Sequence, residues 1–495
     1  MANVEELINI GFNLHQEGKL DDAENTYKEI LDMDCENAEV YNLLGVLNLQ
    51  KGNINDAIQY VEKAVEKSPQ SYFYETLFQA YIRKGEFSKI VSKENEIIKL
   101  FPQDFSLLFN LGLAFKNLKN NKKAIYYYEK ALEINPSSYN AWFNLSKVYL
   151  IEAEVKNAIS ALKICTKIKP HDKETEYFYS LALMRDKNYD KGLKYFESRE
   201  SRDLVFALHN KSYPNKLRLD NRWQGENIKN KTLLVYYEAG FGDSIMFLRY
   251  LPLAKKRCKK LILIIQKPLS ELIKQNKQLG VDTVIDSFIP ESDIDFDVHA
   301  SILSLPHILG LNSKNIFVSS DGYLKADSNE IENFRKKYFN NDQIKIGIKW
   351  RGNTFYDTDR VIPAEIFAPM KLLDGVQVYS LQTFEGSEET NKLPNIIDIG
   401  KDLITFSQTA AALSNIHLVI CNDTSLAHLA GAMNIPCWIM LPYEVNWRWH
   451  TNLDVCDWYN SVRLFRQKSD GDWKSVFDKI MSEINHTLAE YKNSD

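Results

Sequence analysis

The sequence predicts a multidomain protein in which an all-α repeat solenoid precedes an α/β part made of two doubly wound domains. Two observations support this prediction. Prolines recur at one phase in the first two fifths of the 495 residues, and afterwards short apolar runs alternate with helical segments. We expect repeats over residues 1–205, a first α/β domain over 206–327 and a second over 328–495, whose last helix could pack back on the first α/β domain.

The repeats come first along the chain. Pro69, Pro102, Pro136 and Pro170 are separated by 33, 34 and 34 residues, which is the tetratricopeptide period. Small residues where helix A crosses helix B let the two backbones approach, and the proline ends helix B. We therefore expect about six helical hairpins over residues 4–199.

The third repeat departs from the pattern. Phe78 stands at the usual glycine position, and Glu94 stands where an aromatic or aliphatic residue is expected. We expect this repeat to pack less regularly than its neighbours.

A stacked array of this kind curves and offers a concave groove that suits an extended peptide or another protein. The alternative is that the array only dimerises the chain or shields the second half. Both readings involve a protein surface, so we expect a protein partner, and a homo-oligomer formed through the repeats is one form of it.

The composition predicts a cytoplasmic globular protein. Lys+Arg number 61 against 66 Asp+Glu, a net charge of -5 that offers no reason to expect nucleic acid as the main partner. No apolar run approaches a transmembrane segment, and residues 1–6 lack the basic start of a signal peptide. The six cysteines form neither a C-x-x-C pair nor a close cluster with histidine, so no metal site and no disulfide framework are expected.

Short apolar runs in the second part predict two series of parallel strands. The runs are residues 231–237, 261–265 and 282–286 in the first series, and 344–350, 376–381, 395–399, 417–421 and 436–440 in the second. Ligands of such folds bind beyond the carboxyl ends of the strands, here between the two domains.

A glycine turn, Gly240-Phe241-Gly242-Asp243, follows the first strand. Its two glycines allow a tight turn and a close approach of a ligand to the backbone. The turn is not a dinucleotide fingerprint, because Ile245 stands where the third glycine would be, so hydride transfer is disfavoured. Asp243 is either a helix N-cap, the more common case, or a carboxylate placed as a general base.

The first strand of the second domain ends in Lys349-Trp350-Arg351-Gly352-Asn353. The cations Lys349 and Arg351, with Asn353 beside them, could neutralise a diphosphate leaving group. The alternative is a loop with surface ion pairs, which would also explain Asp357, Asp359 and Arg360.

The segment Asn422-Asp423-Thr424-Ser425 lies between a buried strand and a helix that contains His428. Unpaired N–H groups and the positive end of the helix dipole attract an anion there. These side chains could instead only cap the helix, and His428 could be a packed core histidine. The position of this segment late in the second domain, opposite the glycine turn, favours the anion site, with capping alongside it.

One more loop, residues 441–450, is dense in aromatic and charged side chains. Trp447 and Trp449 could cover apolar surface between the domains, or they could stack on a sugar or base.

Five motifs in sequence order carry a resemblance to a known family. They are EAGFGDSIMFLRY (238–250), KIGIKWRGN (345–353), NDTSLAHLAGAMNIPCWIMLP (422–442), NWRWH (446–450) and RLFRQ (463–467). Together they resemble the heptosyltransferase-like glycosyltransferases, glycosyltransferase family 9, and more closely the bacterial proteins that fuse tetratricopeptide repeats to such a domain.

The resemblance implies a GT-B fold, with two Rossmann-like domains, and transfer of a sugar from a nucleotide-sugar without metal or other cofactor. Asp243 matches the aspartate proposed as catalytic base in that family. Asp423, Thr424, Ser425 and His428 match the segment that holds the phosphates and sugar of the donor. Lys349 lies where that family often has a residue that contacts the diphosphate, whereas many repeat-fused relatives have an apolar residue there.

A repeat array joined to a GT-B domain is also the layout of the O-GlcNAc transferases, in which the repeats present a polypeptide. By this analogy we expect a protein O-glycosyltransferase, with flagellin or another secreted or surface protein as one candidate acceptor. The alternatives are a transferase that acts on a lipid-linked or polysaccharide acceptor, and a non-catalytic repeat scaffold.

Overall fold

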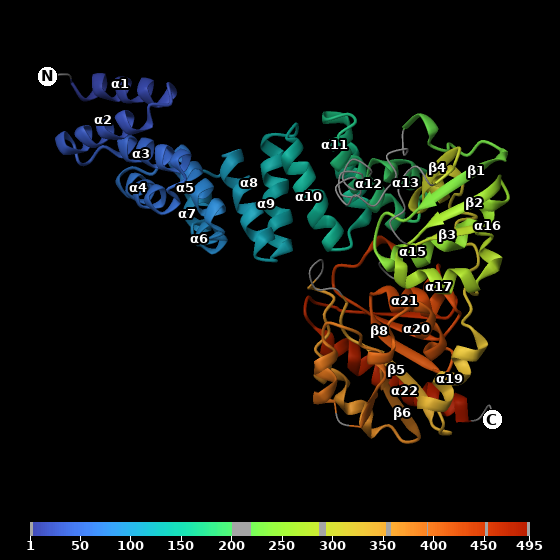
Figure 1. Ribbon diagram of the computed structural model, residues 1–495. Coiled ribbons are helices and arrows are strands. Elements are labelled where there is room, and N and C mark those ends of the chain that lie inside the picture. The colour runs from blue at the N-terminus through green and yellow to red at the C-terminus, as the bar shows by residue number, and fades with distance from the viewer. Residues whose placement is uncertain are drawn as a thin grey trace. The chain divides into compact units, whose positions relative to one another are not determined.

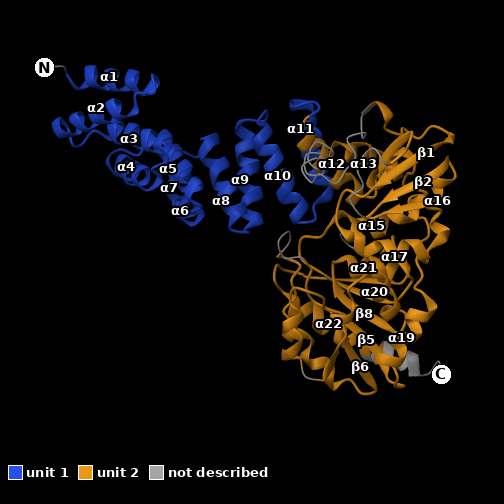
Figure 2. Ribbon diagram, in the orientation of Figure 1, with its two compact units in different colours: residues 1–171 blue, residues 172–495 orange. Residues whose placement is uncertain are grey.

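The computed structural model describes residues 3–199, 219–286, 294–352, 358–393, 395–450 and 454–492. The chain divides into two compact units, Met1–His171 and Asp172–Asp495, which are coloured separately in Figure 2. Helices alone form the first unit, and the second contains both parallel sheets (Figure 1).

Six helical hairpins occupy residues 4–199. Their helices, in chain order, are α1 (Val4–Gln16), α2 (Leu20–Met33), α3 (Ala38–Lys51), α4 (Ile54–Lys67), α5 (Ser71–Lys84), α6 (Phe87–Ser92) with α7 (Glu94–Leu100), α8 (Phe105–Asn117), α9 (Asn121–Ile134), α10 (Tyr139–Ile151), α11 (Val155–Ile168), α12 (Lys173–Arg185) and α13 (Tyr189–Phe196). The prediction of about six hairpins is therefore confirmed.

Close helix crossings explain the glycines of the repeats. A Cβ at Gly45 would lie 2.1 Å from a methyl carbon of Val61, and a Cβ at Gly112 would lie 2.8 Å from the ring of Tyr128. Any larger residue would push the two helices of the hairpin apart. The period in the sequence thus reflects a packing requirement within each hairpin.

The third hairpin is irregular, as its sequence predicts. Its second helix is interrupted at Lys93, between α6 and α7. Phe78 is fully buried in place of the usual glycine, and Glu94 accepts hydrogen bonds from Lys123 and Tyr127 of the next hairpin. A side chain that should have been apolar instead forms a polar contact with the following repeat.

The sixth hairpin, α12 with α13, belongs to the second compact unit. We expected the repeats to reach residue 205, whereas the contacts divide the chain after His171, and residues 200–205 lie outside the described ranges. Tyr189 and Phe196 of α13 share one apolar cluster with Trp223 and with both α/β domains. This hairpin is therefore part of the core of the second unit.

The first α/β domain contains a four-stranded parallel sheet in the order β3-β2-β1-β4. Its elements are η1 (Glu197–Arg199), η2 (Leu219–Asn221), β1 (Ile228–Tyr236), α15 (Phe241–Phe247), η3 (Leu248–Tyr250), α16 (Leu251–Lys255), β2 (Cys258–Ile264), α17 (Lys267–Gln275), η4 (Lys277–Leu279), β3 (Thr283–Ile285), β4 (Val298–Ser301), η6 (Ile302–Ser304) and α18 (Leu305–Ile308). The sequence did not reveal β4, because His299 and Ser301 interrupt its apolar run.

The second α/β domain contains a six-stranded parallel sheet in the order β10-β9-β8-β5-β6-β7. Its elements are α19 (Ser328–Tyr338), β5 (Ile344–Lys349), η7 (Ala364–Leu372), β6 (Val376–Ser380), η8 (Ser387–Lys392), β7 (Ile396–Asp398), η9 (Gly400–Asp402), α20 (Phe406–Leu413), β8 (Leu418–Asn422), α21 (Ser425–Ala432), β9 (Cys437–Leu441), η10 (Trp447–Trp449), β10 (Val462–Arg466) and α22 (Trp473–Lys492). The predicted class, a helical repeat array followed by two α/β domains of the GT-B type, is confirmed.

The last helix corrects one expectation. Trp473, Phe477 and Ile480 of α22 are buried in the cluster that covers one face of the six-stranded sheet. This apolar side of α22 packs on its own domain, so the expectation that the last helix packs back on the first α/β domain is wrong for these residues. The opposite face of the same sheet packs toward the first α/β domain, through α20 and α21.

Candidate functional site

The glycine turn and the start of α21 touch each other. Gly240 is the N-cap of α15, and Gly242 lies in its first turn. A Cβ at Gly242 would lie 2.7 Å from Cδ2 of His428 and 3.6 Å from the Cα of Ser425. Only glycine permits this approach without displacing the histidine ring. The two motifs that the sequence placed at opposite strand ends are thus brought into direct contact.

Aromatic packing supports the same contact between the domains. The ring of Phe241 lies 5.1 Å from the ring of Phe406 at the start of α20. On the other side of the turn, Gln266 donates a hydrogen bond to the carbonyl of Ala239 at 2.9 Å and accepts one from Ser244 at 2.9 Å. The turn is therefore held from both domains.

Asp243 does not cap α15, because Gly240 occupies the N-cap position. The Asp243 carboxylate instead forms an ion pair with Nη2 of Arg448, and its side chain keeps 27% of its surface exposed. Of the two readings from the sequence, the carboxylate lies at the domain contact rather than at a helix cap. Its role as a base stays a prediction.

Sequence reasoning missed Arg448, which lies in η10. Its Nη1 donates to Oδ1 of Asn446 at 2.8 Å, and its guanidinium carbon lies 4.6 Å from the ring centre of Trp447. The loop 441–450 was recognised as rich in aromatic and charged residues, but nothing in its sequence indicates which charged side chain faces Asp243. The tryptophans of this loop are buried, in line with the reading that they cover apolar surface.

His428 is buried at the domain contact and has a hydrogen-bond partner. Its Nδ1 lies 3.0 Å from the hydroxyl of Tyr459, and its ring stacks on Trp449 with 5.1 Å between ring centres. Burial and the positive charges of Arg448, Arg249 and Arg360 hold the pKa of His428 well below its usual range. The imidazole is therefore neutral at pH 7, and contact with a ligand stays a prediction.

Arg360 contacts two residues at the end of β8. Arg360 pairs with the carboxylate of Asp423 at 3.2 Å, and its carbonyl accepts a hydrogen bond from Nδ2 of Asn422 at 2.9 Å. The Oδ1 of Asn422 is buried and has no hydrogen-bond partner among the described residues. Such an orphaned acceptor is costly to bury and is usual where a ligand or water completes the site.

The amino end of α21 lacks a side-chain cap. Thr424 is the N-cap residue, but it makes no side-chain hydrogen bond to the helix, and its Oγ1 lies 3.4 Å from the carbonyl of Asn422 instead. The expectation that these side chains also cap the helix is therefore wrong. Ser425 begins α21, so its backbone N–H belongs to the first turn, where helical acceptors are missing.

Lys349 ends β5 beside this segment, because β5 pairs with β8 so that Lys349 lies opposite Cys421. The lysine side chain is 8% exposed, and its Nζ donates to Oγ1 of Thr383 at 3.2 Å. Burial lowers the pKa of Lys349 to about 8. A buried ammonium at the same strand edge as Asn422 adds a positive charge to the site.

Arg351 is directed elsewhere. Its Nη2 pairs with Glu389 at 2.8 Å, and its backbone N–H donates to Oε1 of Gln382 at 3.0 Å. Gln382 also donates to the carbonyl of Glu385 at 2.7 Å, so it fastens the loop after β5 to the loop after β6. Arg351 and Lys349 therefore have different partners and do not form one cationic pair. Asn353 lies outside the described residues.

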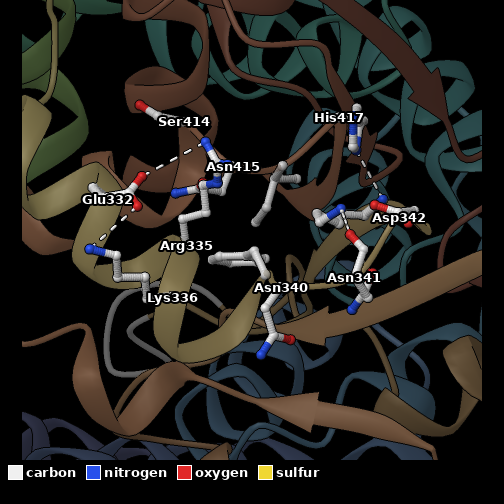
Figure 3. Close-up of a pocket in the computed structure, with 12 residues that line it drawn as sticks. Glu332, Arg335, Lys336, Asn340, Asn341, Asp342, Ser414, Asn415 and His417 are labelled. Atoms are coloured by element: carbon white, nitrogen blue, oxygen red, sulfur yellow. Dashed lines mark hydrogen bonds and ion pairs between the residues drawn. The ribbon is translucent and has the colours of Figure 1, made fainter. Parts of the chain in front are cut away.

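The pocket in Figure 3 lies at the amino ends of the strands of this sheet, opposite to the candidate site. It has a volume of about 610 Å³, and Asn341, Lys345 and His417 are among its lining residues. Lys345 is near the start of β5 and His417 directly precedes β8, so these residues mark the amino ends of the strands. The candidate site lies at the carboxyl ends of the same strands, where this fold class binds ligands.

Two further observations concern metals and membranes. Within the described ranges, His, Cys, Asp and Glu side chains do not gather in groups of three or more that could hold a metal ion. Over the same part of the chain, no helix has both the length and the apolar character needed to cross a membrane.

Known protein families match the repeat part of the chain. Three family models described as tetratricopeptide repeat match residues 14–79, 105–138 and 127–162. The chain therefore contains tetratricopeptide repeats, and repeats of this kind generally mediate interactions between proteins.

Curated relatives are distant. Protein FlbA of Caulobacter vibrioides is 22% identical over 438 residues, covering 81% of this chain and 71% of FlbA. The BBSome complex member BBS4 of Bos taurus is 23% identical over 200 residues, covering 40% of this chain and 38% of that protein. Because the hairpins end at Phe196, the similarity to FlbA, which covers 81% of the chain, extends into the α/β part.

Two solved structures are each similar to about half of the chain or less, at low identity. PilF of Pseudomonas aeruginosa covers 42% of this chain and 97% of its own length, with 15% identity and a TM-score of 0.37. A family 9 glycosyl transferase from Veillonella parvula covers 54% of this chain and 99% of its own length, with 13% identity and a TM-score of 0.42.

Proposed function

We propose that the α/β part transfers a sugar from a nucleotide-sugar to an acceptor hydroxyl. The observation that carries this proposal is the close approach of Gly242 to His428 and Ser425, because it brings the turn that contains Asp243 in one domain next to the start of α21 in the other. Transfer of a glycosyl group needs both of these features: a base for the acceptor and an electropositive place for the leaving diphosphate.

The donor side would be formed by the second domain. The uncapped amino end of α21, at Thr424 and Ser425, offers backbone N–H groups and the positive end of the helix dipole. Lys349 contributes a buried ammonium group, and the orphaned Oδ1 of Asn422 is an acceptor for a hydroxyl or an amide of the ligand. These groups together suit a ligand that carries both phosphate and hydroxyl groups.

The acceptor side would be formed by the first domain. In the proposed step the acceptor oxygen attacks the anomeric carbon of the sugar, while the Asp243 carboxylate takes the proton from the acceptor hydroxyl. The bond from the anomeric carbon to the diphosphate breaks, and the nucleoside diphosphate leaves with the bonding electron pair. The amino end of α21 and the nearby cations stabilise the charge that develops on it.

The repeats support a protein as the acceptor. An array of tetratricopeptide hairpins preceding the α/β part makes a protein the acceptor that we favour, with a serine or threonine hydroxyl as the attacking group. The sugar and the nucleotide are left open, since side chains at the pocket decide them.

Purified full-length protein tests the proposal. We expect one nucleotide-sugar from a panel to raise the thermal stability of the protein, and Asp243→Ala to lower transfer or hydrolysis of that donor about 100-fold or more while binding persists. Asp478→Ala, an exposed carboxylate of α22, is the matched control and should retain activity. An Asp243→Ala protein that folds normally and transfers at the wild-type rate would remove Asp243 from the mechanism.

A further inference from the structure

Arg448 is a buried cation near the candidate site. It is 9% exposed and lies in η10, 205 positions from Asp243 in the chain. Two of its contacts come from its own loop, namely the hydrogen bond to Asn446 and the stacking on Trp447. Its ion pair with Asp243 crosses between the two α/β domains.

Positively charged side chains gather around His428. Arg448, Arg249 and Arg360 all act on its imidazole and lower its pKa. Asp243 pairs with Arg448 and Asp423 pairs with Arg360, while Arg249 donates to the carbonyl oxygens of Met246 and Trp458, at 3.0 Å each. Arg448 therefore lies among other cations and beside the helix that contains His428, whose amino end is itself electropositive.

Arg448 is also incompletely bonded. Its Nε is buried and has no hydrogen-bond partner among the described residues. A guanidinium has five N–H donors in a planar fork, which matches the paired oxygens of a phosphate group. Because Asn446 and Trp447 hold the side chain in place, an oxyanion near the start of α21 could take up its free donor without a large movement of the loop.

We infer that Arg448 is a diphosphate-binding residue whose ion pair with Asp243 is exchanged when the donor binds. Within the proposed transferase reaction, on which this inference rests, Nη2 of Arg448 passes from the carboxylate to a phosphate oxygen. The Asp243 carboxylate is then no longer paired with the guanidinium, so its oxygens are free to accept the proton of the acceptor hydroxyl. Activation of the base is thereby coupled to the presence of the donor.

The direction in which anion affinity changes, when the charge of Asp243 is removed, distinguishes this exchange from a purely structural ion pair. If Asp243 and a phosphate compete for Arg448, removal of the carboxylate charge strengthens anion binding. If the pair only fastens the two domains together, removal of the charge loosens the site, and anion binding weakens or does not change.

The experiment measures the binding of inorganic pyrophosphate to the full chain by calorimetry. We expect Asp243→Asn to bind pyrophosphate about threefold to tenfold more tightly than wild type, and Arg448→Gln to bind it at least about tenfold more weakly. In the Arg448→Gln background, Asp243→Asn should have little further effect, because the two residues act on one ligand. Arg448→Lys should be intermediate, since lysine keeps the charge and loses the planar fork.

Controls separate folding and net charge from the exchange. Asp478→Asn in α22 makes the same change of charge far from the site and should leave pyrophosphate affinity unchanged. Each variant should keep the elution volume and the unfolding temperature of a folded protein. If Asp243→Asn does not fold, the comparison of Arg448→Gln and Arg448→Lys with wild type still tests the inference, because equal affinity in all three overturns it.

The outcomes also separate this inference from the proposed function. Unchanged or weaker pyrophosphate binding in folded Asp243→Asn, or no pyrophosphate binding by wild type at millimolar concentration, overturns the exchange even if sugar transfer is observed. Tighter binding in Asp243→Asn supports the exchange, and in that case the absence of any nucleotide-sugar turnover by wild type would count against the proposed function alone.

Discussion

The fourth and sixth hairpins share one repeat pattern and use it differently. Ala131 of α9 and Arg199, directly after α13, occupy the same repeat position, since they lie 68 residues, or two periods, apart with Cys165 between them. Ala131 is buried against its neighbouring helices, and Arg199 is equally buried but charged. The same repeat position is therefore occupied by an apolar side chain in the fourth hairpin and by a charged side chain with ionic partners in the sixth.

The network around Arg199 explains why a charge is tolerated there. Its guanidinium contacts both oxygens of Glu238, at 2.5 and 3.1 Å, and Oε1 of Glu197 at 2.9 Å, and it donates to Ser304 at 2.7 Å. Burial alone would lower the pKa of Arg199, but the two carboxylates outweigh it and raise that pKa. Glu238 lies two residues before Gly240, so this network fastens the last hairpin to the glycine turn.

The largest expected effect comes from restoring the small residue at this position. Arg199→Ala leaves Glu238 buried without its paired cation, while Glu197 keeps its ion pair with Arg222, and we expect the change to cost about 3–5 kcal/mol of stability. Denaturation followed by tryptophan fluorescence measures this, because seven of the eight tryptophans lie after residue 171. For comparison, Lys123→Ala in the fourth hairpin removes the ion pair with Glu94. Because the Lys123 side chain is about half exposed, the loss should be less than about 1 kcal/mol. Equal losses for the two variants would contradict the contrast between the hairpins.

A second expected effect is a pH dependence at the other end of the sixth hairpin. His450 is buried, and its Nε2 lies 3.2 Å from the hydroxyl of Tyr189 and 3.4 Å from Asp457, while its Nδ1 faces the carbonyl of Arg185 at 3.3 Å. Burial, assisted by Lys187 and Arg466 and opposed by Asp457 and the carbonyl, lowers the pKa of His450 to about 4.

The sign of the pH effect follows from this lowered pKa. Between about pH 6.5 and 4 the unfolded chain binds a proton at His450 that the folded protein does not, so stability falls as the pH is lowered through this window. The contribution is at most roughly 3 kcal/mol, and it is complete near pH 4. Unfolding curves of wild type and His450→Gln at pH 7 and pH 4.5 should converge at the lower pH. A difference between the two proteins that does not change with pH would contradict this assignment.

The smallest expected effects concern the glycines of the two hairpins. A Cβ at Gly112 would lie 2.8–3.1 Å from three ring carbons of Tyr128, and a Cβ at Gly192 would lie 2.7 Å from Cγ and 3.2 Å from the backbone nitrogen of Met184. We expect each alanine substitution to cost about 1–3 kcal/mol, with the larger loss at Gly112, because there three carbons of one rigid ring must move together. Thermal unfolding monitored by circular dichroism would show whether the order is reversed.

Local patterns in the sequence predicted most of the architecture. The proline period and the small residues at helix crossings predicted six hairpins, and Phe78 with Glu94 predicted the irregular one. Strands β4 and β10 were missed because polar residues interrupt their apolar runs, His299 and Ser301 in β4 and Arg463 and Arg466 in β10. Patterns of this kind work where the determinant of structure lies within a few residues.

The candidate site was predictable in part. Two glycines before Asp243, and a polar turn between a buried strand and α21, marked two strand ends that the structure brings into contact. Arg448 and Arg360 were not identified as partners, because arginines in loops are common and their direction depends on the fold. The absence of a side-chain cap on α21 also needed the structure, since a threonine at an N-cap normally makes that bond.

The sequence by itself determined the repeat period, the order of strands and helices, and the segments that end at the carboxyl edge of each sheet. Those properties follow from periodicity and turn chemistry, which act over short distances along the chain. Only the tertiary structure decided that Asp243 meets Arg448 across 205 positions, that Arg199 replaces a small repeat residue in order to bind Glu238, and that His428 lies against Gly242. These partners come together when the two sheets and the last hairpin pack into one core. Burial makes an unpaired charge costly, so a charged side chain in this core is stable only beside a partner of opposite charge.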